Sequence, residues 1–238
     1  AASCAIYGAR AANGVILVTT KSGKSGKINI SYDGYYGWQN VAKMPELLNA
    51  KQYMSVMDEL QFNQGKTGYK WSSLMPQALY DSYMNGTNAG TNWLEAIRKS
   101  NAPIQNHALN ITGGTDVSRF SLGVSYTNQD GILGKPVESK FERTTVRLNS
   151  DHVLYKADNR NIVTFGETML YTYKTKNGIG IGNQYSNDIS SCLRAWPIVP
   201  EYNENGGYYE YNDLNTGGFF GYDSGASNPV AMMVYTRG

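Results

Sequence analysis

The sequence predicts a mainly β protein, part of an antiparallel transmembrane β-barrel that carries helical loop insertions. Three observations support this fold class. One strand alternates apolar and polar residues over twelve positions, the predicted connections alternate between short and long, and the composition is rich in aromatic residues but poor in charge. Among the 238 residues, 19 are Tyr and 26 are Gly, while only 17% are charged. Ordinary soluble domains carry about 25% charged residues, and aromatic-rich strands are typical of all-β proteins.

The clearest predicted strand runs from Lys27 to Trp38. Its apolar face consists of alternate residues: Ile28, Ile30, Tyr32, Tyr36 and Trp38. Gly34 is the only gap in that face, and polar residues dominate the other face. This alternation has the period of a strand. A tilted membrane strand needs roughly 9–11 residues, so the predicted strand is long enough to cross a bilayer.

A helical excursion over residues 40–105 is predicted next. Asn49 is a good N-cap with Gln52 at the third helical position. The residues that follow recur with helical spacing and predict one apolar face: Tyr53, Val56, Met57 and Leu60. A second helix is predicted from Ser73 to Asn85, ending at Gly86, and a third from Asn92 to Lys99, with Trp93 and Ile97 on one side.

Four more strands are predicted to follow as hairpins: His107 to Thr112, Arg119 to Tyr126, Glu142 to Asp151 and Asn161 to Lys174. Short turns at Gly113 to Asp116 and Lys156 to Arg160 alternate with longer connections. An up-and-down membrane barrel has this alternation. The third of these strands carries Arg143, Arg147 and Asn149 on its polar face. A water-filled lumen tolerates such residues without partners, whereas the core of a β-sandwich does not.

The remaining tail, residues 177–229, has the Gly and aromatic content of an ordered extracellular loop. Asn228-Pro229 indicates a turn, after which Val230 to Tyr235 is the candidate for the next strand. Those six residues are also the longest apolar run, so no helix is expected to span a bilayer.

The opening segment, Ala1 to Lys24, predicts a small turn that leads into a buried strand. Asn13-Gly14 is a strong turn signal, and Val15 to Thr20 is apolar and β-branched on both faces. A polar, flexible exit begins at Lys21. The chain has neither an initial Met nor a signal peptide, and we expect it to be a piece of a longer protein.

The run from Ala5 to Lys21 closely resembles the end of the plug domain in the SusC/RagA family of TonB-linked outer-membrane proteins. Later segments resemble early-barrel landmarks of the same family: Trp93 to Ile97, Ala102 to His107, Gly113-Gly114, Asn128 to Gly131 and Arg147 to Asp151. The resemblance covers essentially the whole chain. It implies that residues 1–24 are the C-terminal end of a plug domain. Residues 25–238 are then the N-terminal part of a β-barrel, with long extracellular loops at about 40–105 and 177–229.

The resemblance also implies a function. Family members form a large barrel of roughly 22 strands with a plugged lumen in the outer membrane of Gram-negative bacteria. They import nutrients, here an oligosaccharide or a peptide, together with a SusD-like surface lipoprotein. Energy comes from TonB through a segment absent from this chain. Outer-membrane lipid is the expected surrounding of the apolar strand faces.

The sequence presents no catalytic, cofactor-binding or metal site. His107 and His152 each stand alone, and Cys4 and Cys192 fit no metal or redox spacing, although their pairing stays open. The net charge of +2 gives no electrostatic argument for nucleic acid. We therefore expect a protein that is not an enzyme.

Aromatic residues of the long loops are the candidate contacts for a substrate or a partner: Trp71, Trp93, Trp196, Tyr208, Tyr209 and Tyr211. Aromatic faces stack on sugars and on peptide side chains, and Tyr adds a hydroxyl hydrogen bond. The alternative for each ring is that it packs the loops.

A second hypothesis is a soluble β-sandwich that acts as a carbohydrate-binding or adhesin domain. It predicts that the apolar strand faces pack on a second sheet of the same chain. The barrel predicts instead that these faces form one outward belt, with Arg143, Arg147 and Asn149 pointing inward.

Overall fold

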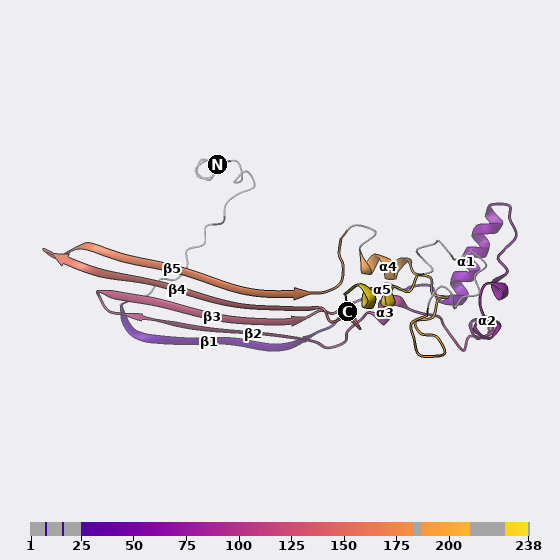
Figure 1. Cartoon of the computed structure of the whole chain (residues 1–238), viewed down its shortest axis with the longest axis horizontal. Helices are drawn as coiled ribbons and strands as arrows, with labels where there is room; N and C mark the ends of the chain where they lie inside the picture. Colours follow the sequence, from indigo (N-terminus) through magenta and orange to yellow (C-terminus); the bar gives the residue numbers. More distant parts are fainter. Residues whose placement is uncertain (1–7, 9–15, 17–24, 183–186, 210–226, 238) are drawn as a thin grey trace. The chain divides into compact units, whose positions relative to one another are not determined.

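A single antiparallel sheet of five strands dominates the described part of the chain (Figure 1). The computed structural model describes residues 25–182, 187–209 and 227–237, with Gly8 and Ile16 besides. The strands lie side by side in chain order: β1 (Gly26–Gln39), β2 (Ala102–Gly114), β3 (Ser118–Asp130), β4 (Lys140–Ala157) and β5 (Arg160–Asn177). The sheet is not closed within this chain. The predicted plug segment, including the strand at Val15 to Thr20, lies outside the described residues except for Gly8 and Ile16.

All five strands are expected from the alternation of the sequence, and four of them, β2 to β5, are clearly longer than predicted. β2 begins at Ala102 rather than His107, and β4 and β5 have 18 residues each. The turn between β4 and β5 contains Asp158 and Asn159, both with positive φ, as a two-residue hairpin turn requires. The mainly β fold class is therefore confirmed.

The helices are α1 (Ala50–Asn63), η3 (Trp71–Ser73), α2 (Gln77–Met84), α3 (Trp93–Ala96), α4 (Asp188–Arg194) and α5 (Pro229–Arg237). Among the described residues, none is both long enough and apolar enough to cross a bilayer. The predicted second helix divides into η3 and α2, because the residue before Pro76 disfavours the α conformation. Gly86, with φ +79°, follows α2 as expected.

The first helix begins as predicted but turns a different face to its neighbours. The backbone N–H of Gln52 donates to Asn49 Oδ1 at 2.8 Å, and the Asn49 N–H donates to Gln52 Oε1 at 3.0 Å. The predicted apolar face is wrong in part, since Val56 and Leu60 are 49% and 45% exposed. Ala50 and Met54 are buried instead, because the helix packs through its small and flexible side chains.

The candidate strand at Val230 to Tyr235 is wrong: these residues belong to α5. Asn228 Oδ1 accepts hydrogen bonds from the backbone N–H groups of Val230 and Ala231 at 3.1 Å, which starts the helix. A short apolar run fits a strand or a buried helix equally well, and long-range packing decides between them. Here Val230 and Met233, three positions apart, are buried.

The chain divides into two units. The hairpin unit comprises Ala1–Gly34, His107–Tyr126 and Thr144–Tyr173, and the loop unit comprises Tyr35–Asn106, Thr127–Arg143 and Lys174–Gly238.

Two long excursions leave the sheet, the first between β1 and β2 and the second after β5. They share one hydrophobic core inside the loop unit. Its most deeply buried side chains come from both excursions: Tyr83, Trp93, Ile97, Cys192, Ile198, Val199, Val230 and Met233. Backbone and side-chain hydrogen bonds tie the same segments together. Thr91 Oγ1 donates to the Val199 carbonyl at 2.7 Å, and the Thr91 N–H donates to the Pro197 carbonyl at 2.8 Å. The loops are therefore a folded structure rather than loose connections.

Candidate functional site

One face of the hairpin unit is a polar groove of about 540 Å³. Apart from Val124, alternate residues of four strands line it: Asn29, Ser31, Asp33, Ala108, Asn110, Thr112, Ser121, Gly123, Ser125, Thr145 and Arg147. Thr172 extends the polar face to β5, since its Oγ1 lies 3.5 Å from that of Thr145. Arg147 thus lies on the face for which the sequence analysis predicted it.

The opposite face of the hairpin unit is apolar and uncovered. On β1, Ile28, Ile30 and Tyr32 are 62–65% exposed. On β5, alternate residues continue this face: Val163, Phe165, Met169, Tyr171 and Tyr173. The described residues form a single sheet, so no second sheet of the described chain packs on this face. The β-sandwich hypothesis requires such packing and is therefore not favoured.

Two polar clusters interrupt the apolar face. The hydroxyl of Tyr32 lies 2.6 Å from Nδ1 of His107, and the two rings stack at 6.1 Å. On β4, His152 joins two serines: Nδ1 lies 2.8 Å from Ser118 Oγ and Nε2 lies 2.9 Å from Ser150 Oγ. Both histidines stand alone in the sequence, because their partners lie on neighbouring strands and leave no local signal.

The His152 cluster does not have the order of a hydrolytic triad. The hydroxyl of Ser150 donates to Glu167 Oε1 at 3.0 Å, so it accepts its second hydrogen bond from Nε2–H of His152. In a hydrolytic triad the carboxylate orients the histidine, and the serine hydroxyl donates its hydrogen bond to the histidine. Here the carboxylate faces the serine, which fits a structural chain of hydrogen bonds.

The predicted aromatic contacts lie in the loop unit, and most pack inside it. Trp71, Trp93 and Tyr209 are buried, with 6%, 1% and 8% of their surface exposed. Trp196 and Tyr208 are half-buried, and Tyr211 lies outside the described residues. The structure brings Trp93 and Trp196 together, since the indole N–H of Trp93 donates to the Trp196 carbonyl at 3.0 Å. Their contact with a substrate or partner stays a prediction.

Burial suppresses ionisation in the core of the loop unit. It raises the pKa of the Cys192 thiol to about 12, with a further contribution from the nearby Asp188 carboxylate. Burial likewise raises the pKa of Tyr83 above its ordinary range, and the Tyr83 hydroxyl donates to the Ile198 carbonyl at 3.2 Å. Both groups are neutral at physiological pH. Within the described ranges, no group of three His, Cys, Asp or Glu side chains is placed to hold a metal.

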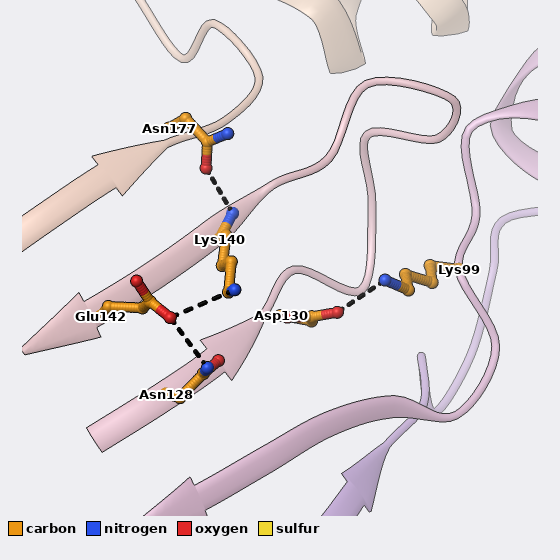
Figure 2. Close-up of polar contacts among 6 residues, drawn as sticks. All are labelled: Lys99, Asn128, Asp130, Lys140, Glu142 and Asn177. Carbon is orange, nitrogen blue, oxygen red and sulfur yellow. Dashed lines mark hydrogen bonds and ion pairs between the residues drawn. The ribbon is translucent and has the colours of Figure 1, made fainter. Parts of the chain in front are cut away.

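A second cavity, of about 580 Å³, lies in the loop unit where β3, β4 and β5 meet their loops. Figure 2 shows the polar contacts of three residues that line it, Asp130, Lys140 and Asn177. Lys99 Nζ lies 2.6 Å from Asp130 Oδ2, and Lys140 Nζ lies 3.1 Å from Glu142 Oε1. The backbone N–H of Lys140 donates to Asn177 Oδ1 at 2.9 Å, which joins β4 to β5. No short sequence pattern predicts this site, because its residues come from three separate segments.

Known proteins resemble the chain over most of its length. No protein-family model matches it. TonB-dependent receptor P3 of Formosa agariphila is 31% identical over 213 residues, which covers 87% of this chain and 18% of the receptor. TonB-dependent receptor SusC of Bacteroides thetaiotaomicron is 31% identical over 150 residues, which covers 63% of this chain and 13% of SusC. The chain thus spans less than a fifth of the length of these two relatives.

Solved structures show the same fold. The RagAB peptide importer in its 'open-open' state superposes with a TM-score of 0.62 at 22% identity, over 89% of this chain and 25% of that one. The 'closed-closed' state gives a TM-score of 0.61 at 20% identity. These names denote receptors and importers rather than enzymes. The resemblance to the SusC/RagA family is thereby confirmed: the chain is a homologue of TonB-dependent receptors of this type and corresponds to one segment of them.

Proposed function

We propose that the chain is a segment of an outer-membrane receptor that imports an oligosaccharide or a peptide with energy delivered through TonB. One observation carries the proposal, namely that the hairpin unit has one exposed apolar face and one polar face. Lipid solvates apolar side chains, whereas a water-filled lumen solvates polar ones. The apolar face bearing Ile28 and Ile30 then contacts lipid, and the groove bearing Asp33 and Arg147 lines the lumen.

The proposal assigns a different role to each of two parts of the chain. Residues 1–24 supply the end of the plug that blocks the lumen at rest, and residues 25–238 supply the first barrel strands. TonB pulls on the plug and opens a path for the cargo. The sheet of this segment needs further strands, since β1 and β5 are both edge strands here and lipid cannot satisfy unpaired backbone groups.

The partner in this proposal is a SusD-like surface lipoprotein that covers the loops at 40–105 and 177–229. Support comes from the homology to SusC and from the structured loop unit, which offers a folded surface. On that surface, Tyr202 and Tyr235 are 51% and 71% exposed, and Tyr208 contacts both rings. Exposed tyrosines are enriched where proteins bind one another.

A pair of lysine substitutions tests the membrane orientation in the full-length receptor. Ile30→Lys places a charge on the apolar face, and Ser31→Lys places the same charge one residue away, in the polar groove. A lysine near the bilayer midplane costs about 2–4 kcal/mol on the lipid face, so Ile30→Lys is expected to reduce the heat-modifiable band in outer membranes strongly. Ser31→Lys is expected to leave the intensity of that band unchanged, because water in the lumen solvates the added charge. Equal effects of the two lysines would contradict the proposed orientation.

Co-purification tests the partner. The tagged full-length receptor is extracted from outer membranes of cells that also express its cognate lipoprotein. A Tyr202→Ala, Tyr235→Ala variant is expected to weaken recovery of the lipoprotein while the heat-modifiable band stays. Tyr35→Ala, which removes an exposed tyrosine of β1, is the control. No recovery with the wild-type receptor would contradict the partnership.

A further inference from the structure

We propose that the cavity at the loop end of β3, β4 and β5 binds an acidic group of the cargo, so that the imported molecule is a short acidic peptide with apolar side chains. The inference rests on the proposed transport function and deepens it. It is carried by the shape and lining of the cavity, the charge around it and an unpaired hydroxyl in its wall.

The walls of the cavity are mainly aliphatic. Leu133 and Ile132 come from the connection between β3 and β4, and Ile179 and Ile181 from the segment after β5. Phe141 of β4 adds an aromatic ring. A volume of about 580 Å³ lies within the usual range of ligand pockets, which combine apolar walls with a few polar groups. Aliphatic walls suit an apolar peptide side chain better than sugar hydroxyls, which need hydrogen bonds.

The charge around the cavity is positive. Figure 2 shows that two carboxylates near the cavity each have a lysine: Asp130 pairs with Lys99, and Glu142 pairs with Lys140. Lys174 and Lys176 also line the cavity, and neither forms an ion pair within the described part of the chain. Among the residues that line the cavity, the three lysines (Lys140, Lys174 and Lys176) against the one carboxylate of Asp130 leave a net charge of +2, which a carboxylate-bearing ligand can neutralise.

The wall contains a buried hydroxyl that lacks a partner. Ser139 Oγ lines the cavity and has no hydrogen-bond partner among the described residues. Two glycines leave room for it, since a Cβ at Gly134 would lie 2.4 Å from Ser139 Oγ and one at Gly131 would lie 2.4 Å from Ser139 Cβ. A buried, unpaired hydroxyl is unfavourable, and a ligand carboxylate can accept its hydrogen bond.

Lys174 and Lys176 lie on the strand face that the cargo is proposed to pass. On β5, Lys174 and Lys176 occupy the same alternate positions as Thr172, which bonds to Thr145 of the polar groove. Side chains at alternate positions of a strand share one face. Lys174 and Lys176 therefore share one face of β5 with Thr172.

The test measures peptide affinity by calorimetry on the purified full-length receptor. The probes are a capped hexapeptide of alternating Leu and Glu and its counterpart of alternating Leu and Gln, so that only the charge differs. The Lys174→Gln, Lys176→Gln variant is expected to lose roughly twofold to thirtyfold in affinity for the acidic peptide and little for the neutral one. Ser139→Ala is expected to lose roughly threefold to tenfold for the acidic peptide.

The matched control is Lys27→Gln, Lys156→Gln, which removes two exposed lysines of the hairpin unit and leaves the cavity intact. Its affinity for the acidic peptide is expected to equal that of the wild type. Equal affinity of the wild type for the two peptides, or equal losses in the two double variants, would overturn the inference. Tighter binding of an acidic oligosaccharide, such as hexagalacturonate, would overturn the peptide assignment. The heat-modifiable band of the same preparations separates failure of the cargo proposal from failure of the receptor proposal. Absence of the band contradicts the proposed membrane function, whereas a normal band with no preference for the acidic peptide contradicts only the cargo.

Discussion

The hydroxyl of Tyr32 lies 2.6 Å from Nδ1 of His107, and the Tyr32 ring fills the gap that Gly34 leaves in the apolar face of β1. A Cβ at Gly34 would lie 2.5 Å from the Tyr32 hydroxyl oxygen. The glycine and the tyrosine therefore act as a pair. The missing side chain makes room for a ring that carries a polar group across an apolar surface to a hydrogen-bonding partner.

This pair predicts non-additive substitutions. Gly34→Ala displaces the Tyr32 ring and breaks the contact with His107, and Tyr32→Phe removes the same hydrogen bond directly. Each is expected to lower the free energy of unfolding by about 1 kcal/mol, measured by urea unfolding of the detergent-solubilised receptor. The double variant is expected to cost clearly less than the sum. Strict additivity would show that the alanine leaves the tyrosine in place.

The capping box of α1 predicts a local loss of stability. Asn49→Ala removes the acceptor for the Gln52 N–H and is expected to cost about 0.5–2 kcal/mol in the unfolding free energy of the loop unit. Asn63→Ala, at the exposed end of the same helix, is the matched control and is expected to be nearly neutral. Amide hydrogen exchange in residues 50–54 reads out the first turn. Unchanged exchange in Asn49→Ala would contradict the role of the cap.

The two excursions approach each other closely at Gly90, and this predicts that a side chain there is destabilising. The φ of Gly90 is +83°, and a Cβ there would lie 2.4 Å from the Pro197 carbonyl oxygen and 2.8 Å from Ala50 Cβ. Gly90→Ala is expected to cost more than about 2 kcal/mol and to expose residues 188–199 to proteolysis. Gly86→Ala is the control, since φ is +79° there with nothing within 4 Å of the added Cβ, and it should cost only about 1–2 kcal/mol. Similar costs at both glycines would mean that the excursions separate without penalty.

The raised pKa of Cys192 predicts low reactivity and a loss of stability at high pH. In a Cys4→Ser background, maleimide at mildly alkaline pH is expected to spare Cys192 in the folded receptor and to label it after denaturation, because only the thiolate attacks. The unfolded thiol ionises near pH 9 and the folded thiol near 12, so the folded state loses stability as the pH rises between these values. Mass spectrometry measures the labelling. Rapid modification of the folded receptor would show that the core around Cys192 opens readily.

Features with a local cause were predictable from the sequence. Strand alternation from Lys27 to Trp38 follows from the two different surroundings of the strand faces, and the Asn49 cap follows from four consecutive residues. Features that depend on distant partners were not predictable. Val230 and Met233 are buried in a helix because residues far back in the chain complete their core. The His152 cluster and the cavity near Ser139 likewise assemble from separate strands, so no short sequence pattern predicts them.

The hydrogen bond from Thr91 to Val199 spans 108 positions, and β2 to β5 all lie between its ends. Closing so long a loop costs entropy before any contact can compensate, which makes such contacts late events in folding. The core around Trp93 is therefore expected to lock only after both hairpins have been built. The time at which residues 50–97 become resistant to protease therefore reports when the hairpins are complete during membrane assembly. A substitution that delays the hairpins should delay that resistance, although it leaves every residue of the excursion unchanged.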